Sequence, residues 1–193
     1  VRHASGDMWE ETYLSSGAVR ERHHAGGDQN TTGIFVEDNW TLGRLVLTGG
    51  ARVDHWRIRD GFYENRDAAG APIALTAFPD RSGWEGSFRA GALYRVNGAI
   101  ALRAAAYTGF RLPTLNELYR PFVVFPITTE ANANLNPEKL RGFEVGFDLS
   151  PVPDLTLSAT AFHNRLKNAV ANVTTGPTLR QRQNVAAIRA QGI

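Results

Sequence analysis

The sequence of 193 residues contains no cysteine and only one methionine. The absence of cysteine excludes disulfide bonds, thiolate-bound zinc and thiol nucleophiles. Lysine is also scarce, because nearly every basic side chain is an arginine and only Lys139 and Lys167 are lysines. Lys and Arg together number 21 against 19 Asp and Glu, and the resulting net charge of +2 is too small to indicate a nucleic-acid-binding surface. We expect no nucleic-acid partner.

Long apolar runs are missing as well, since none approaches the about 18 residues that a transmembrane helix needs. A membrane β-barrel is not excluded by this absence, because its strands alternate apolar and polar residues and give a weak hydropathy signal. The chain begins at Val1, not at methionine, and ends at Ile193 within an alternating pattern. We therefore expect residues 1–193 to be part of a longer chain, and to form one partial barrel domain.

Alternation of apolar and polar residues dominates the chain and predicts β-strands. In one such segment Phe143, Val145 and Phe147 would face one side and Glu144 the other. The same alternation recurs in residues 45–53, 87–96, 100–107 and 155–161.

Short turns join these segments into hairpins. The predicted turns lie at residues 41–44, 96–98 and 150–154. The turn at 150–154 would place Leu149 opposite Leu155, and the turn at 96–98 would place Tyr94 opposite Ile100. Both registers bring the apolar residues of the two strands onto one face, as a half-buried hairpin requires.

Longer connections alternate with these short turns along the sequence. We expect irregular loops at residues 15–28, 60–82, 111–137 and 173–180. In an up-and-down meander alternate connections lie at the same edge, so one edge would carry short turns and the other long loops. Outer-membrane barrels show this asymmetry. A soluble sheet with one buried face is the alternative, but it gives no reason for the segregation.

The aromatic residues fit the barrel interpretation. Trp40 and Tyr94 lie beside short turns, whereas Trp56, Trp84 and Phe110 lie toward the long loops. These positions correspond to the two aromatic girdles of a membrane barrel. The sequence thus predicts an all-β fold, an antiparallel meander of about eight long strands.

Two motifs carry a resemblance to a known family. The segment "GFRLPTLNELY" is followed by "NANLNPEKLRGFEVGFDL", and together they closely resemble the TonB-dependent outer-membrane receptors. The motif residues are Phe110, Arg111, Pro113, Thr114, Glu117, Leu118, Tyr119, Asn132, Leu135, Pro137, Glu138 and Glu144. The sequence departs from the family pattern at Ala133, where proline is frequent.

The resemblance implies a fold and a function. It implies part of a barrel of about 22 strands that an N-terminal plug domain fills. It further implies an active-transport receptor in the bacterial outer membrane, not an enzyme, with no cofactor, catalytic residue or resident metal. The ligand would be a scarce solute, most often a ferric siderophore, and the partners would be the plug, TonB and outer-membrane lipid. A self-contained small outer-membrane barrel with a structural or adhesive role is the alternative.

The segment after residue 110 is the first candidate for ligand contact. Residues 114–119 are predicted to form a helical turn, with Thr114 as its N-cap and Glu117 at the capping-box position. Leu115, Leu118 and Tyr119 would pack this turn onto the barrel rim. The candidate ligand-binding residues are Arg111, Tyr119, Arg120, Phe122, Phe125 and Trp84, each with loop packing as its alternative role.

Other polar residues admit a chemical and a structural interpretation. His23 and His24 would contact a metal or haem, or would belong to a solvated loop, which we favour. Arg89, Arg95 and Arg103 would attract an anionic chelate, or would line the lumen and pair with plug carboxylates or cross-strand partners, which we favour.

A glycosidase would need two carboxylates at a fixed separation. Glu117 and Glu144 lie on different predicted elements, and nothing in the sequence fixes the distance between them. We therefore expect no such activity.

Overall fold

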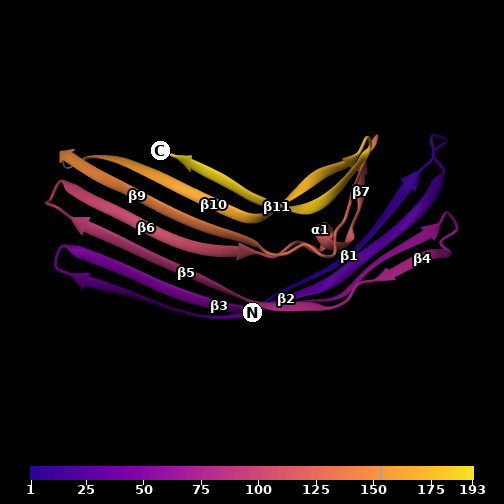
Figure 1. The fold of residues 1–193 in the computed structure, drawn as a ribbon, viewed down its shortest axis with the longest axis horizontal. Helices are drawn as coiled ribbons and strands as arrows, with labels where there is room; N and C mark the ends of the chain where they lie inside the picture. Colours follow the sequence, from indigo (N-terminus) through magenta and orange to yellow (C-terminus); the bar gives the residue numbers. More distant parts are fainter. Residues whose placement is uncertain (153) are drawn as a thin grey trace.

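The computed structural model describes residues 1–152 and 154–193, so Pro153 in the predicted turn at 150–154 lies outside the described residues. Figure 1 shows one curved sheet with a short helix held inside the curve. The elements are β1 (Arg2–Tyr13), β2 (Val19–Leu42), β3 (Leu45–Asp67), β4 (Pro72–Ala77), β5 (Arg81–Arg95), β6 (Ile100–Arg111), α1 (Leu115–Tyr119), β7 (Phe122–Val124), β8 (Ile127–Glu130), β9 (Glu138–Val152), β10 (Leu155–Gly176) and β11 (Leu179–Gly192). Within the described residues, no helix has the length and apolar character needed to cross a membrane.

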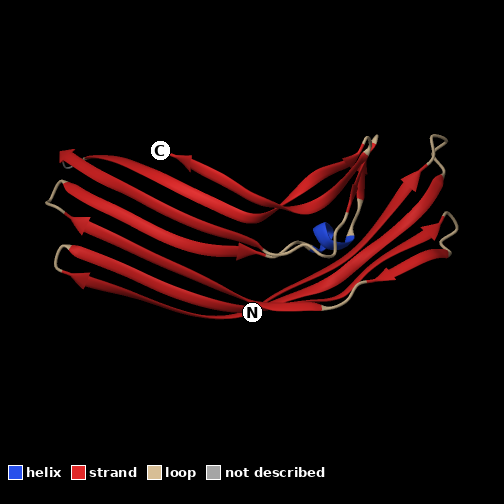
Figure 2. Ribbon diagram, viewed as in Figure 1, coloured by secondary structure: helices blue, strands red, loops and turns tan. Residues whose placement is uncertain are grey.

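Eight of the strands are long, and they confirm the predicted meander. The sheet order is β1-β2-β3-β5-β6-β9-β10-β11, with each neighbouring pair antiparallel. Short β4 pairs with β3, and the β7–β8 hairpin joins the sheet through a parallel pairing of β8 with β11. The three predicted short turns gather at one end of the sheet, whereas the β3–β5 and β6–β9 connections lie at the other, together with the turns of the long β1–β2 and β10–β11 hairpins (Figure 2).

The turn at 41–44 is confirmed, but the register predicted for the β5–β6 hairpin is wrong by two residues. Leu42 pairs with Leu45 around Gly43, whose φ of 60° suits glycine. Tyr94 pairs with Leu102, not with Ile100. The turn is longer because the Asn97 side chain accepts hydrogen bonds from the backbone N–H groups of Ala99 and Ile100, both at 2.8 Å.

The β9–β10 register is also shifted by two residues. Val152 pairs with Leu155 beside the turn, and one extra residue of β9 in the irregularity that follows brings Leu149 opposite Leu157. Side chains alternate with a period of two, so a shift of two leaves every side chain on its predicted face. The apolar face was therefore predicted correctly from a wrong register.

Three of the four predicted loops are largely strand. Residues 19–28 belong to β2, residues 60–67 to β3 and residues 173–176 to β10. Strand pairing depends on backbone hydrogen bonds, so it continues through polar sequence where both faces meet water. Only residues 112–137, which we call the mouth segment, are mainly irregular, and they contain α1, β7 and β8.

The two faces of the sheet differ in chemistry. We call the face that α1 contacts inward and the opposite face outward. Trp40, Tyr94 and Trp84 are 47%, 45% and 68% exposed, and Phe143 is 52% exposed on the outward face. Trp56 was wrongly assigned to the outer girdle: it is 7% exposed and faces inward beside Ile58, because even-numbered residues of β3 face the interior there.

Candidate functional site

The helical turn predicted at the start of the mouth segment is present as α1. The Oγ1 of Thr114 accepts a hydrogen bond from the backbone N–H of Glu117 at 3.2 Å. In return the Glu117 carboxylate accepts from the Thr114 backbone N–H at 2.7 Å. This reciprocal capping box satisfies two of the free N–H groups at the helix start. Local sequence therefore determines where α1 begins.

Packing, in contrast, places α1 inside the sheet curve and not on its rim. Leu118 and Leu135 are fully buried, and Tyr119 is 2% exposed. They form one apolar cluster with Trp56 and Ile58 of β3. The Tyr119 ring also stacks on Phe78, with ring centroids 4.9 Å apart. The mouth segment thus packs on the inward face of β3, where Gly61 leaves room for the Tyr119 ring.

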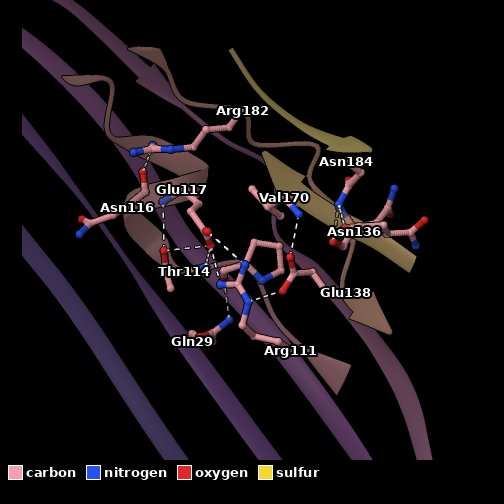
Figure 3. A network of polar contacts seen from close by, with 12 residues as sticks. Gln29, Arg111, Thr114, Asn116, Glu117, Asn136, Glu138, Val170, Arg182 and Asn184 are labelled. Carbon is pink, nitrogen blue, oxygen red and sulfur yellow. Dashed lines mark hydrogen bonds and ion pairs between the residues drawn. The ribbon is translucent and has the colours of Figure 1, made fainter. Parts of the chain in front are cut away.

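Arg111 links the two ends of the mouth segment. Its Nε donates to Glu138 at 2.5 Å, and its other two nitrogens donate to Glu117 at 2.9 and 3.1 Å (Figure 3). Glu138 also accepts a hydrogen bond from the backbone N–H of Val170 in β10, at 2.7 Å. One arginine thereby connects the end of β6, the start of α1 and the start of β9.

The environment of Glu117 favours its charged form. Burial by itself raises the pKa of this carboxyl, but hydrogen bonds from Arg111 and Thr114 outweigh it. The pKa therefore lies below its ordinary value. The ion pair with Arg111 is intact at neutral pH.

Arg182 of β11 holds the other end of α1. Its guanidinium donates to the carbonyl oxygens of Asn116 at 2.5 Å and Arg120 at 2.7 Å. The Asn116 carbonyl also accepts from the Arg120 backbone N–H at 3.2 Å, whereas Arg120 is the C-cap residue, whose own carbonyl lies beyond the helix. Arg182 is buried, which lowers the pKa of its guanidinium. It also lies over the Phe122 ring, 5.0 Å from the centroid.

Asparagines fix the return of the mouth segment toward β9. The Asn132 side chain donates to the Arg182 carbonyl at 2.9 Å. Asn184 accepts from the backbone N–H of Asn136 at 2.8 Å and donates to the carbonyl oxygens of Asn136 and Asn168 at 3.0 and 2.7 Å (Figure 3). The residues of the second motif thus hold the mouth segment against β10 and β11.

The six candidate ligand-binding residues are not brought together. Arg111 and Tyr119 are engaged in the contacts described above. Arg120 pairs with Glu10 of β1 at 3.2 Å. Phe125 is 92% exposed at the tip of the β7–β8 hairpin, and Phe122 lies in the same hairpin.

Trp84 lies apart from the other five candidates. It is on the outward face, where its ring centroid is 4.6 Å from that of His55. Its cross-strand partner in β3 is also His55. Loop packing was the alternative role for all six residues, and the buried ring of Tyr119 has that role.

The two adjacent histidines lie in β2, not in a loop, and face opposite sides. His23 contacts the Asn65 side chain at 2.6 Å and the Tyr63 hydroxyl at 2.9 Å. His24 contacts Asp7 at 2.5 Å and stacks on Trp9 with centroids 3.9 Å apart. Within the described residues, no group of three or more His, Asp or Glu side chains is arranged to hold a metal ion.

Of the three interior arginines, Arg89 and Arg103 have the cross-strand partners that we favoured. Arg89 pairs with Glu37, and Arg103 pairs with Asp148 at 2.9 Å. Glu144 accepts a hydrogen bond from the Tyr107 hydroxyl at 2.7 Å.

Sequence reasoning missed Arg182 and Asn184, which hold the mouth segment from β11. Both residues lie in the polar, alternating segment "RQRQN", which is typical of any exposed strand.

Comparison with known proteins identifies the family. Residues 9–193 match the family described as TonB dependent receptor-like, beta-barrel. The vitamin B12 transporter BtuB of Vibrio vulnificus is 34% identical over 74 residues, which cover 38% of this chain and 11% of that protein.

Solved structures share the fold. The hemophore receptor HasR of Serratia marcescens, in complex with its hemophore HasA and heme, aligns with a TM-score of 0.71 and 18% identity over 98% of this chain and 38% of that one. A mutant of the ferric enterobactin receptor PfeA of Pseudomonas aeruginosa, in complex with enterobactin, aligns with a TM-score of 0.55 and 14% identity over 98% and 37%. This chain therefore spans well under half the length of these relatives. Because the family match extends over nearly all its residues, the chain belongs to the TonB-dependent receptors, a family of outer-membrane transport receptors, and forms part of the β-barrel.

Proposed function

We propose that this chain is part of the barrel of an active-transport receptor for a ferric siderophore or a similar metal chelate, energised through TonB. The observation that carries the proposal is the family match over residues 9–193. Relatives named for heme, enterobactin and vitamin B12 support a scarce, large and often metal-containing ligand. The same match favours transport over a structural or adhesive small barrel.

The mouth segment supports this function through its position. Arg111 and Arg182 hold it on the inward face, so it would occupy part of the barrel interior. It would act as a fixed constriction and not as a mobile lid. Because the mouth segment is already held in place, it does not have to become ordered when the ligand binds, and less conformational entropy is lost on binding. We propose that residues 1–193 act with a separate plug domain in the same longer chain.

The ligand contacts that we propose lie on the mouth segment, where Phe125 is exposed and Phe122 and Arg120 are half-buried. Phe125 offers an unpartnered ring at the tip of the β7–β8 hairpin, and Phe122 and Arg120 lie nearer its base. Aromatic rings and arginines suit an aromatic or anionic chelate. Arg111 and Tyr119 would act by holding the mouth segment in place. Trp84, on the outward face, would contact lipid.

Uptake measurements test the transport proposal. Cells carrying a deletion of the gene should lose energy-dependent uptake of one radiolabelled ferric chelate from a panel of siderophores, and plasmid-borne full-length receptor should restore it. Collapse of the proton-motive force should abolish uptake but leave ligand bound at the surface. Unchanged uptake of every ferric chelate, heme and cobalamin in the deletion strain would refute the proposal.

A matched pair of substitutions tests the proposed contacts. Phe125→Ala should weaken binding of the transported ligand by about tenfold, as removal of an exposed aromatic contact does. Trp84→Ala removes a larger ring from the outward face and should leave binding unchanged. Equal effects of the two substitutions would mean that Phe125 is not a ligand contact.

A further inference from the structure

The outward face of β9, β10 and β11 carries a cluster of basic side chains that the transport function does not use. We call it the basic patch, and it consists of Lys139, Arg141, Arg165, Lys167 and Arg189. Its two members in β9 alternate with inward-facing residues and continue the face of Phe143 and Val145. All five residues are exposed.

Strand register aligns these charges in rows. Arg165 pairs with Arg141 on one side and with Arg189 on the other, so three arginines lie side by side across three strands. Lys167 pairs with Lys139 in the adjacent row. Paired residues in antiparallel strands have Cβ atoms about 5 Å apart, and like charges at that distance destabilise a sheet.

Acidic residues compensate only one of these five charges. Within the described residues, only Lys139 has a carboxylate partner, Glu85 at 2.9 Å, and the other four basic side chains form no ion pair. The neighbouring outward positions are also free of acids. They are occupied by Thr108, Phe110, His163, Ala187 and Gln191.

The basic patch lies directly beside the lipid-facing apolar band. Arg141 is two residues from Phe143, and Arg165 is four residues from Ala161, in each case in the direction away from the short β9–β10 turn. Short turns lie on the periplasmic side of outer-membrane barrels. The basic patch is therefore at the boundary between the apolar band and the extracellular medium, at the level of the outer-leaflet headgroups.

We propose that the basic patch binds the phosphate groups of a phosphorylated glycolipid in the outer leaflet. Three adjacent guanidinium groups match several phosphate oxygens, because each presents a planar fork of N–H donors. A phosphorylated headgroup at this height would neutralise the rows of like charge. The acyl chains of the same lipid would lie along Phe143, Val145 and Phe147.

The first experiment needs no substitution. Full-length receptor in detergent is incubated with a bis-phosphorylated glycolipid or with its dephosphorylated form, and bound lipid is counted by native mass spectrometry. The phosphorylated lipid should bind at least about tenfold more tightly, and added salt should weaken it. Equal binding of the two lipids would overturn the proposal. Displacement of both lipids by low concentrations of inorganic phosphate would overturn it as well, because it would indicate a site for the free ion.

Substitutions then locate the site. Arg165→Gln, at the centre of the row, should weaken glycolipid binding about fivefold, and R141Q/R165Q/R189Q about a hundredfold. Arg57→Gln is the matched control, because this outward arginine of β3 has only Ser82 and Asn30 as cross-strand partners. Heat-dependent gel mobility confirms that each variant is folded. Wild-type glycolipid binding by a folded triple variant, or an equal loss in R57Q, would overturn the assignment.

Discussion

The hairpins at the short-turn end of the sheet and the mouth segment differ in the kind of contact that determines their structure. In the β5–β6 and β9–β10 hairpins the essential property is the alternation of two faces, so a register shift of two residues changes little. In the mouth segment each contact is individual: Thr114 caps one helix, and Arg182 satisfies two particular carbonyl oxygens. Because the alternation repeats along each strand, the hairpins should tolerate substitution of single residues. The mouth segment should be sensitive to substitution, because each of its contacts is made by one particular residue.

Truncation of one leucine in each region should give the largest difference. Leu118→Ala leaves a cavity in the buried inward cluster and should destabilise the mouth segment by about 2–5 kcal/mol. Leu157→Ala removes the same atoms from a side chain that is 51% exposed on the outward face, where lipid fills the space, so it should cost less than about 1 kcal/mol. Hydrogen exchange of residues 112–137 in the full-length receptor measures the first effect, and equal protection in both variants would contradict the comparison.

Removal of the arginine that caps α1 should have the next largest effect. Arg182→Met keeps most of the side-chain volume but removes the donor to the Arg120 carbonyl and one of the two donors to the Asn116 carbonyl, at a cost of about 1–3 kcal/mol. The effect should appear as faster hydrogen exchange in α1, with β5 and β6 unchanged. Arg103→Met is the control, because its interior ion pair with Asp148 lies toward the short-turn end of β6 and β9, away from the end of β6 that leads to α1. Similar exchange in α1 for both variants would mean that Arg182 does not hold the helix.

A methyl group added beneath the mouth segment should have a moderate effect. Gly61→Ala would place a Cβ against the Tyr119 ring, and the ring must shift at a cost of about 1–3 kcal/mol. The control is Gly98→Ala in the β5–β6 turn, where an added Cβ meets no atom within 4 Å. Combining Gly61→Ala with Tyr119→Ala should reduce the additional cost of the methyl group. Full additivity of the two losses would exclude this contact as the cause.

Acidification should have the smallest effect, and it should be confined to the mouth segment. The pKa of Glu117 is lowered from 4.5 in the folded protein, so its contribution to stability is complete above pH 4.5 and is lost as pH falls through the folded pKa. The measurement is acrylamide quenching of Trp56 in full-length receptor with every other tryptophan replaced by phenylalanine. Quenching should rise below pH 4.5 in this protein and should depend less on pH when Glu117→Gln is added.

The fold was largely predictable because its signals are local and repeated. Alternation around Phe143 and Phe147 predicted the outward face, and the segregation of connections predicted the meander. The capping box of Thr114 and Glu117 was predictable as well, since both residues lie within one helical turn. The strand ends were not predictable, because polar residues of β2 and β3 continue the ladder through backbone bonds that leave no periodic apolar signal.

The candidate site was predictable only in part. The motif containing Arg111 and Tyr119 was found, but its residues were expected on the rim, whereas Tyr119 is buried on the inward face. Trp56 was expected in the outer girdle, although its even position in β3 directs it inward. Arg182 and Asn184 lie far along the sequence from their partners in the mouth segment, by 50 residues in the pair Asn132–Arg182 and by 48 in the pair Asn136–Asn184. No local sequence pattern indicates such distant partners.

The sequence by itself determined the class of fold, the family and the division of each strand into two faces, because these depend on the period-two direction of side chains and on short motifs. The tertiary structure alone decided which face encloses α1, which carbonyl oxygens Arg182 satisfies and which basic side chains lie side by side. These properties depend on strand order and register, which bring distant residues within a few ångströms of one another. For this reason the basic patch, although every arginine in it is visible in the sequence, becomes a site only in the sheet.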